Sequence, residues 1–107
     1  MPLRGPDLLE AAQDSISRIE IALTNQAITS EVAGSPEDRS PRSIRWILEG
    51  SEMMGQIVLW EDGQAELDLA DVATGDVKAE HRQIEDQLGL QRALSAVRDW
   101  VTRKPSD

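Results

Sequence analysis

The segment GQIVLWEDGQAELDL, residues 55–69, restricts the fold more than any other part of the chain. Two runs that favour β-structure, residues 55–60 and 64–69, flank the tripeptide Glu61-Asp62-Gly63. Strand-forming runs separated by two or three residues that include Asp-Gly are typical of a β-hairpin. Because an isolated hairpin is only marginally stable, the remaining chain has to supply strands and helices that cover its apolar side.

The turn of this hairpin admits two registers, which place Trp60 on opposite faces. A two-residue Asp-Gly loop groups Val58 and Trp60 with the aliphatic residues of the second strand. A three-residue loop, a type I turn with Gly63 at the left-handed bulge position, turns both residues toward the charged side instead. One face then carries only aliphatic side chains: Ile57, Leu59, Ala65, Leu67 and Leu69. Since register follows the separation of apolar from charged residues, we predict the three-residue loop, with a positive φ at Gly63.

The flanking sequence predicts a helix on either side of the strands. Apolar residues recur at steps of three and four from Leu8 to Leu23, which indicates a helix over residues 7–24 with Asp7 as its N-cap. Similar spacing from Leu90 to Val101 predicts a second helix that starts near Asp86 and ends at 103–105.

Five strands are expected between the helices, at residues 28–32, 44–49, 55–60, 64–72 and 77–84, with a loop at 34–42. Short connections favour an antiparallel meander, and two amphipathic helices then cover one sheet face and leave the other open. The sequence therefore predicts one α+β domain over residues 1–107, with a sheet of four or five strands and both helices on the same face.

The open face of this sheet carries a candidate interaction surface. If Ile44, Trp46 and Leu48 point inward, Ile47 points outward with Val58 and Trp60. We call these three outward residues the Trp60 patch; its expected rim is Arg45, Glu49, Glu66 and Asp68. An aromatic anchor in a charged rim resembles a binding hot spot, but such residues also serve simply to cover a sheet and keep it solvated. Trp46 and Trp100 are expected to be packing residues.

Charge and composition narrow the classes of partner. The chain has 20 Asp and Glu against 11 Lys and Arg, a formal net charge of −9. This balance disfavours nucleic acid and anionic membranes and suits a basic protein partner, or serves solubility alone. There is no cysteine, no apolar run as long as a membrane span and no signal-peptide pattern, so we expect a soluble cytoplasmic protein.

Residues that could carry catalysis are sparse. His81 is the only histidine, and Glu80-His81 forms either a base with its orienting carboxylate or, more commonly for a lone strand histidine, a structural hydrogen bond. The serines lack the glycines of a nucleophile elbow, and there is no Gly-rich phosphate loop. The carboxylates from Glu61 to Asp71 lack the order of a calcium loop. The sequence predicts no enzyme, no metal and no cofactor.

The stretch GQIVLWEDGQAELDLADVATGDVKAEH, residues 55–81, resembles the central part of TriTu-type immunity proteins of bacterial polymorphic toxin systems. The similarity covers about residues 44–103 and consists of a hairpin, an acidic strand, a Thr-Gly turn, a Glu-His pair and a final helix. The residues that carry the similarity are Gly55, Ile57, Leu59, Trp60, Glu61, Gly63, Leu67, Thr74, Gly75, Glu80 and His81. Leu59 replaces the expected valine, and aromatic residues expected near Ala79 and Arg82 are absent.

The resemblance implies an antitoxin that binds a cognate toxin domain directly, one that in the founding system resembles an ADP-ribosyltransferase acting on elongation factor Tu, within polymorphic systems that use type VI secretion. It adds Glu61 to the candidate partner-binding residues, beside Trp60. A monomer in a one-to-one complex fits this role. A small acidic secretion chaperone, usually a dimer, is the alternative hypothesis, and a domain whose acidity serves solubility alone is the third.

Overall fold

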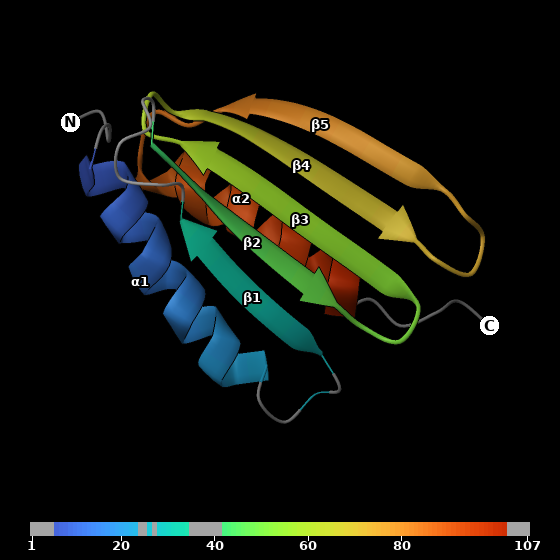
Figure 1. Ribbon diagram of the computed structural model, residues 1–107. Helices are drawn as coiled ribbons and strands as arrows, with labels where there is room; N and C mark the ends of the chain where they lie inside the picture. Colours follow the sequence, from blue (N-terminus) through green and yellow to red (C-terminus); the bar gives the residue numbers. More distant parts are fainter. Residues whose placement is uncertain (1–5, 24–25, 27, 35–41, 103–107) are drawn as a thin grey trace.

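The computed structural model describes residues 6–23, 26, 28–34 and 42–102. Along the chain, one helix precedes five strands and a second helix follows them (Figure 1). The elements are α1 (Pro6–Leu23), β1 (Thr29–Gly34), β2 (Ser43–Glu49), β3 (Met53–Trp60), β4 (Gln64–Asp71), β5 (Val77–Gln83) and α2 (Gln87–Thr102). Neighbouring strands are all antiparallel, and the sheet keeps the order β1-β2-β3-β4-β5. The predicted meander is confirmed.

Both helices pack on one face of this sheet. Figure 1 looks onto the opposite face, with α2 behind the middle strands and α1 beside β1. Alternate residues of β2, β3 and β4 are buried beneath the helices, which is the period of two expected for a half-covered sheet. The largest fully buried side chains come from helices, strands and the final connection: Trp46, Leu8, Ile16, Leu48, Ile57, Leu59, Leu67, Ile84, Leu90, Leu94 and Val97. The α+β fold class is therefore as predicted.

The hairpin between β3 and β4 adopts the three-residue loop. Leu59 pairs with Ala65 and Ile57 with Leu67, so the aliphatic residues share the helix side. Gly63 has a φ of 94°, and its N–H donates to the Trp60 carbonyl at 3.0 Å. This register places Trp60 on the face away from the helices, as the separation of apolar from charged residues predicted.

Glycine at position 55 permits the close approach of α2 to β3. A Cβ atom at Gly55 would lie 2.9 Å from Val97 Cγ1 and 3.0 Å from Val101 Cγ2. Such separations are below ordinary van der Waals contact, so a side chain here would force the Val97 and Val101 side chains to shift. Glycine is therefore favoured at position 55 by the packing of α2 on β3, and at position 63 by the positive φ of the turn.

The ends of several elements differ from the predicted ones by one or two residues. β3 starts at Met53 rather than at Gly55, and β1 spans 29–34 rather than 28–32. Helix α1 begins at Pro6, so Asp7 lies in its first turn and is not the N-cap. Asp86 does cap α2, because its Oδ1 accepts the Gly89 N–H at 2.7 Å. The predicted ends of both helices and most of the 34–42 loop lie outside the described residues.

The three tryptophans have three different environments. Trp46 is fully buried in the core, and its indole N–H has no hydrogen-bond partner among the described residues. Trp100 is half-buried, and its Nε1 donates to the Ala70 carbonyl at 3.0 Å, which ties α2 to β4. Trp60 is half-buried on the other side of the sheet. Two are packing residues as expected, and Trp60 belongs to the open face.

Candidate functional site: the open sheet face

The open face is formed by the residues of all five strands that point away from the helices. Register places them in rows that run across the sheet. One row is Glu31, Ile47, Gln56, Asp68 and Ala79; the next is Ala33, Arg45, Val58, Glu66 and His81. On one side of these rows lie Thr29, Glu49, Met54, Ala70 and Val77, and on the other Ser43, Trp60, Gln64 and Gln83.

The structure brings the predicted Trp60 patch together. Val58 lies between Arg45 and Glu66 in one row, with Trp60 two residues further along β3 and Ile47 diagonally opposite on β2. All three residues of the patch are half-buried. Of the rim, Arg45, Glu49 and Glu66 are exposed and Asp68 is half-buried.

Glu61 occupies the turn that follows Trp60. Its side chain is half-buried, and its backbone N–H donates to the Arg42 carbonyl at 2.9 Å. This bond joins the tip of the β3–β4 hairpin to the residue that precedes β2. Glu61 therefore lies at one end of the open face, beside Trp60, rather than within a row of the sheet.

Gln56 is a member of this surface that the sequence analysis missed. It stands between Ile47 and Asp68 in the same row, and its Nε2 donates to Asp68 Oδ2 at 3.1 Å. The bond holds the Asp68 carboxylate across the sheet and separates Ile47 from the acidic strand β4. The signal was present, because Gln56 lies two residues before Val58 and so shares its face.

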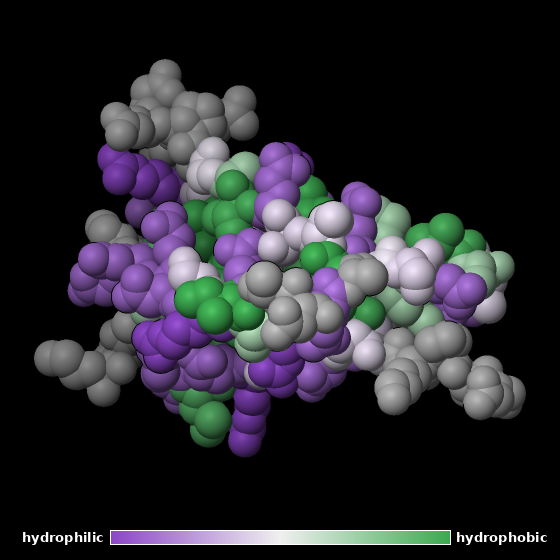
Figure 2. Space-filling view, turned by 90° about the horizontal axis from the view of Figure 1, so that it is seen from below, coloured by the Kyte–Doolittle hydropathy of each residue, from purple (hydrophilic) through white to green (hydrophobic). Residues whose placement is uncertain are grey.

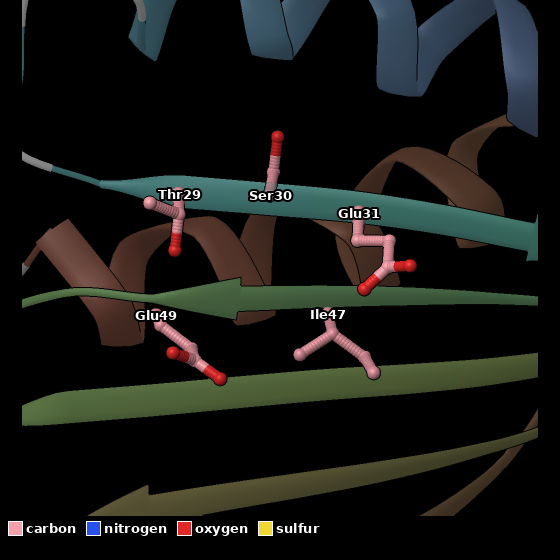
Figure 3. A pocket seen from close by; sticks show the side chains of 5 residues that line it. All are labelled: Thr29, Ser30, Glu31, Ile47 and Glu49. Carbon is pink, nitrogen blue, oxygen red and sulfur yellow. The ribbon is translucent and has the colours of Figure 1, made fainter.

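Among the described residues, three shallow hollows along the open face are each bordered by at least two carboxylates. The first, of about 330 Å³, is lined by Thr29, Ser30, Glu31, Ile47 and Glu49 (Figure 3). The second, of about 290 Å³, is lined by Ile47, Glu49, Met54, Gly55, Gln56, Asp68 and Ala70. The third, of about 260 Å³, is lined by Glu66, Asp68, Ala79, Glu80 and His81. Met54 and Ala70 extend the apolar area beyond the predicted patch.

The open face carries unneutralised negative charge. Its carboxylates are Glu31, Glu49, Glu66 and Asp68. None of them forms an ion pair with another residue in the part of the chain that the structure describes. Arg45 and the single histidine, His81, are basic residues that share one row of this face. A positively charged partner would meet these carboxylates without first breaking an internal ion pair.

The Glu80-His81 pair is divided between the two faces of β5. Glu80 pairs with Leu67 and points to the helix side, whereas His81 pairs with Glu66 and points to the open face. The bond from the Arg82 guanidinium, 2.9 Å from Glu80 Oε2, and then the Lys78 ammonium hold the pKa of the Glu80 carboxyl below its ordinary value. The interpretation of Glu80 as the orienter of His81 is therefore wrong.

No metal site accompanies this surface within the described ranges: they contain no group of three or more His, Cys, Asp or Glu that could hold an ion. Alternating carboxylates on neighbouring strands spread across the sheet rather than converge on one point. The geometry is suited to contact with another macromolecule over a broad, shallow area.

The fold and this surface define a small α+β domain with helices on one face of an antiparallel sheet and an acidic, partly apolar face left open. The chain belongs to the TriTu family of immunity proteins: the family model described as "Immunity protein TriTu" matches residues 12–100. A search of curated proteins and a search of solved structures each gave no match. In the described residues, neither helix has the length and apolar character needed to cross a membrane.

Proposed function

We propose that this protein is an antitoxin that neutralises a cognate toxin domain by binding it through the open sheet face. Membership of an immunity-protein family is the observation that carries the proposal. The open face supports it, because it combines a half-buried aromatic side chain with unpaired charge and with hollows that a partner can fill. Such a role requires neither a catalytic residue nor a cofactor of its own.

The Trp60 patch is the proposed anchor of the complex. Neighbouring residues already cover part of Trp60 and Val58. A partner therefore needs to desolvate only the apolar surface that remains exposed. A large aromatic at the centre of an interface contributes far more than the polar rim around it. Partner-binding roles are proposed for Trp60, Val58, Ile47, Arg45, Glu61, Glu66 and Asp68.

The proposed partner presents a basic surface. The chain carries a net charge of −9, and four carboxylates of the open face form no ion pair with any other residue that the structure describes. Long-range attraction between such surfaces accelerates association and disfavours acidic competitors. The family resemblance adds a finer proposal: the toxin is an ADP-ribosyltransferase acting on elongation factor Tu, delivered by type VI secretion and met in the cytoplasm by its antitoxin.

The test is to purify the chain with the toxin domain encoded beside its gene and to measure the mass of the complex by light scattering. We expect a one-to-one complex of two folded proteins, and loss of the toxin's activity when the chain is added in equimolar amount. A chain that is an obligate dimer and binds only an unfolded segment of its partner would instead identify a secretion chaperone. A chain that does not bind the toxin would refute both roles.

Reversing the charge of Glu66 and Asp68 should slow association with the toxin and leave folding almost unchanged. Each exposed ion pair contributes only about 0.2–1 kcal/mol, so the expected effect is on steering rather than on the lifetime of the complex. The measurement is stopped-flow association of the Glu66→Lys, Asp68→Lys double variant at several ionic strengths. The unmodified chain should associate more slowly as salt screens charges beyond a Debye length of about 10 Å at 0.1 M.

Charge reversal on α2 is the matched control for this pair. Asp99 is exposed on the helix side and is paired with Arg98 at 2.9 Å, away from the open face. Asp99→Lys should change the association rate less than Glu66→Lys or Asp68→Lys does when each is made singly. Association that is independent of salt, or a double variant that associates as fast as the original, would show that the carboxylates serve only to solvate the sheet.

A further inference from the structure

The two edges of the sheet are built differently. On β5 the helix-side residues are Lys78, Glu80 and Arg82, and Glu80 joins the other two at 3.2 Å and 2.9 Å. Charged residues that point inward at a sheet edge discourage pairing with a further strand. On β1 the corresponding residues are Ser30, Val32 and Gly34, which carry no charge. Only the β5 edge therefore has this protection.

In the part of the chain that the structure describes, no strand pairs with the free edge of β1. All six of its residues are exposed, and it is one of the two edge strands of the sheet, with α1 running alongside it in Figure 1. Within the described residues its backbone bonds only to β2. Its link to α1 is a side-chain bond on the helix side, which the Ser30 hydroxyl donates to the Glu20 carboxylate. The unpaired backbone groups of such an edge are a template for another strand.

The surroundings of β1 favour a basic occupant. The hollow of about 330 Å³ beside β1 is lined by Glu31, which lies opposite Ile47 on the neighbouring strand, and by Glu49, two residues further along β2 (Figure 3). An added strand would run about 4.8 Å from β1, so an outward side chain opposite Glu31 would lie within reach of this hollow. A lysine or arginine there could lay its aliphatic stem toward Ile47 and its charge between the two carboxylates.

A second copy of the chain is a poor occupant of the same edge. Two copies would each bring a net charge of −9, and pairing β1 with β1 would bring two Glu31 residues close together. Like charges on directly neighbouring strands are destabilising. Figure 2 views the molecule from the side of α1 and β1 and shows hydrophilic residues interspersed with separate small hydrophobic groups. Backbone pairing and charge, rather than a broad apolar contact, therefore define this edge.

We infer that β1 accepts an extended, basic segment of the partner protein as a sixth strand of the sheet. The inference rests on the proposed function for the identity of the partner, which is the toxin domain. Strand addition fixes the partner by main-chain bonds, while the Trp60 patch and the hollows of the open face recognise its side chains. The inference thereby extends the proposed interface from the open face around the β1 edge.

Amide hydrogen exchange of the full chain, free and bound to the toxin domain, tests the inference residue by residue. In the free protein every second β1 amide lacks a strand partner and should exchange quickly. On binding, these amides should slow by on the order of 100-fold, because exchange now requires the added strand to open. The free-edge amides of β5 should keep their rates. Exchange on the toxin side should slow in one short run that contains Lys or Arg.

Substitution of Val32 provides an independent measurement. Val32 is 38% exposed on the helix side of β1, away from the open face. Val32→Lys copies the inward charge of β5 and should weaken toxin binding at least about tenfold. Val32→Thr, which keeps a β-branched neutral residue, should bind within about twofold of the original. Thermal unfolding of both variants in the free state checks that the sheet is retained.

Three results would overturn the inference. Toxin binding with unchanged β1 exchange would restrict the interface to the open face and leave the proposed function standing. Protection of β1 in the free protein, accompanied by a doubled mass, would assign the edge to a second copy. Absence of toxin binding would overturn the inference and the proposed function together.

Discussion

Gly63→Val should lower the free energy of unfolding by about 3 kcal/mol, through backbone strain and overpacking together. Gly63 has a φ of 94°, a conformation that a β-branched residue rarely adopts. A Cβ atom there would also lie 2.5 Å from the Ile84 carbonyl oxygen and 2.6 Å from Gln83 Nε2. The carbonyl oxygen cannot move freely, because the Ile84 N–H donates to the Gly63 carbonyl at 2.7 Å. Urea unfolding followed by tryptophan fluorescence measures the loss.

Gly75 is a matched control for this substitution. It also has a positive φ, 79°, but a Cβ atom there would meet nothing within 4 Å. Gly75→Val should therefore show the conformational cost alone, about 1 kcal/mol. The difference between the two variants measures the steric conflict at the hairpin. Equal losses at both positions would show that the contact between Gly63 and the end of β5 adds nothing, and a neutral Gly63→Val would contradict the bulged turn.

Trp60→Ala should weaken toxin binding by about 2 kcal/mol or more, which is roughly a 30-fold rise in Kd, while the chain remains folded. The side chain lies on the open face, outside the cluster of buried residues that forms the core. Its removal takes away apolar contact area with the partner and leaves the packing beneath the helices in place. Isothermal titration with the toxin domain gives the affinity, and urea unfolding of the free variant gives its stability.

Val77 supplies the control for Trp60 on the same face of the sheet. It is 72% exposed on β5, far from the Trp60 patch in strand order. Val77→Ala should leave the affinity within about twofold if the interface is centred on the patch. Unchanged affinity of Trp60→Ala would remove Trp60 from the interface. Unfolding of that variant would show that Trp60 supports the sheet itself.

The alternation of residues in the central hairpin was enough to predict its register. Only the three-residue loop gathers Ile57, Leu59 and Leu67 on one side and leaves Glu66 and Asp68 on the other. The two-residue loop would instead leave Ile57 and Leu59 on the face that carries Glu66 and Asp68, so the separation of apolar from charged side chains determines which way Trp60 points. The same local regularity predicted both helices, the order of the strands and the antiparallel meander.

Element ends were less predictable because they depend on individual caps and contacts. The Asp7-to-Glu10 spacing suits an N-cap, but α1 starts one residue earlier at Pro6, which is a good first helical residue. Met53 extends β3 because the two strands of the β2–β3 hairpin continue to pair up to Glu49 and Met54, and Gly50 donates its N–H to the Met53 carbonyl at 2.8 Å.

The sequence by itself determined the elements, their order and the division of each strand into an apolar and a polar side, since these follow from the spacing of residues along the chain. Tertiary structure decided the rest: that α2 crosses β3 at Gly55, and that Gln56 stands between Ile47 and Asp68 and bonds to the Asp68 carboxylate. It also decided that β1 has an edge without inward charges. These properties depend on which residues of different strands and helices become neighbours, and periodicity within a single strand carries no information about its neighbours.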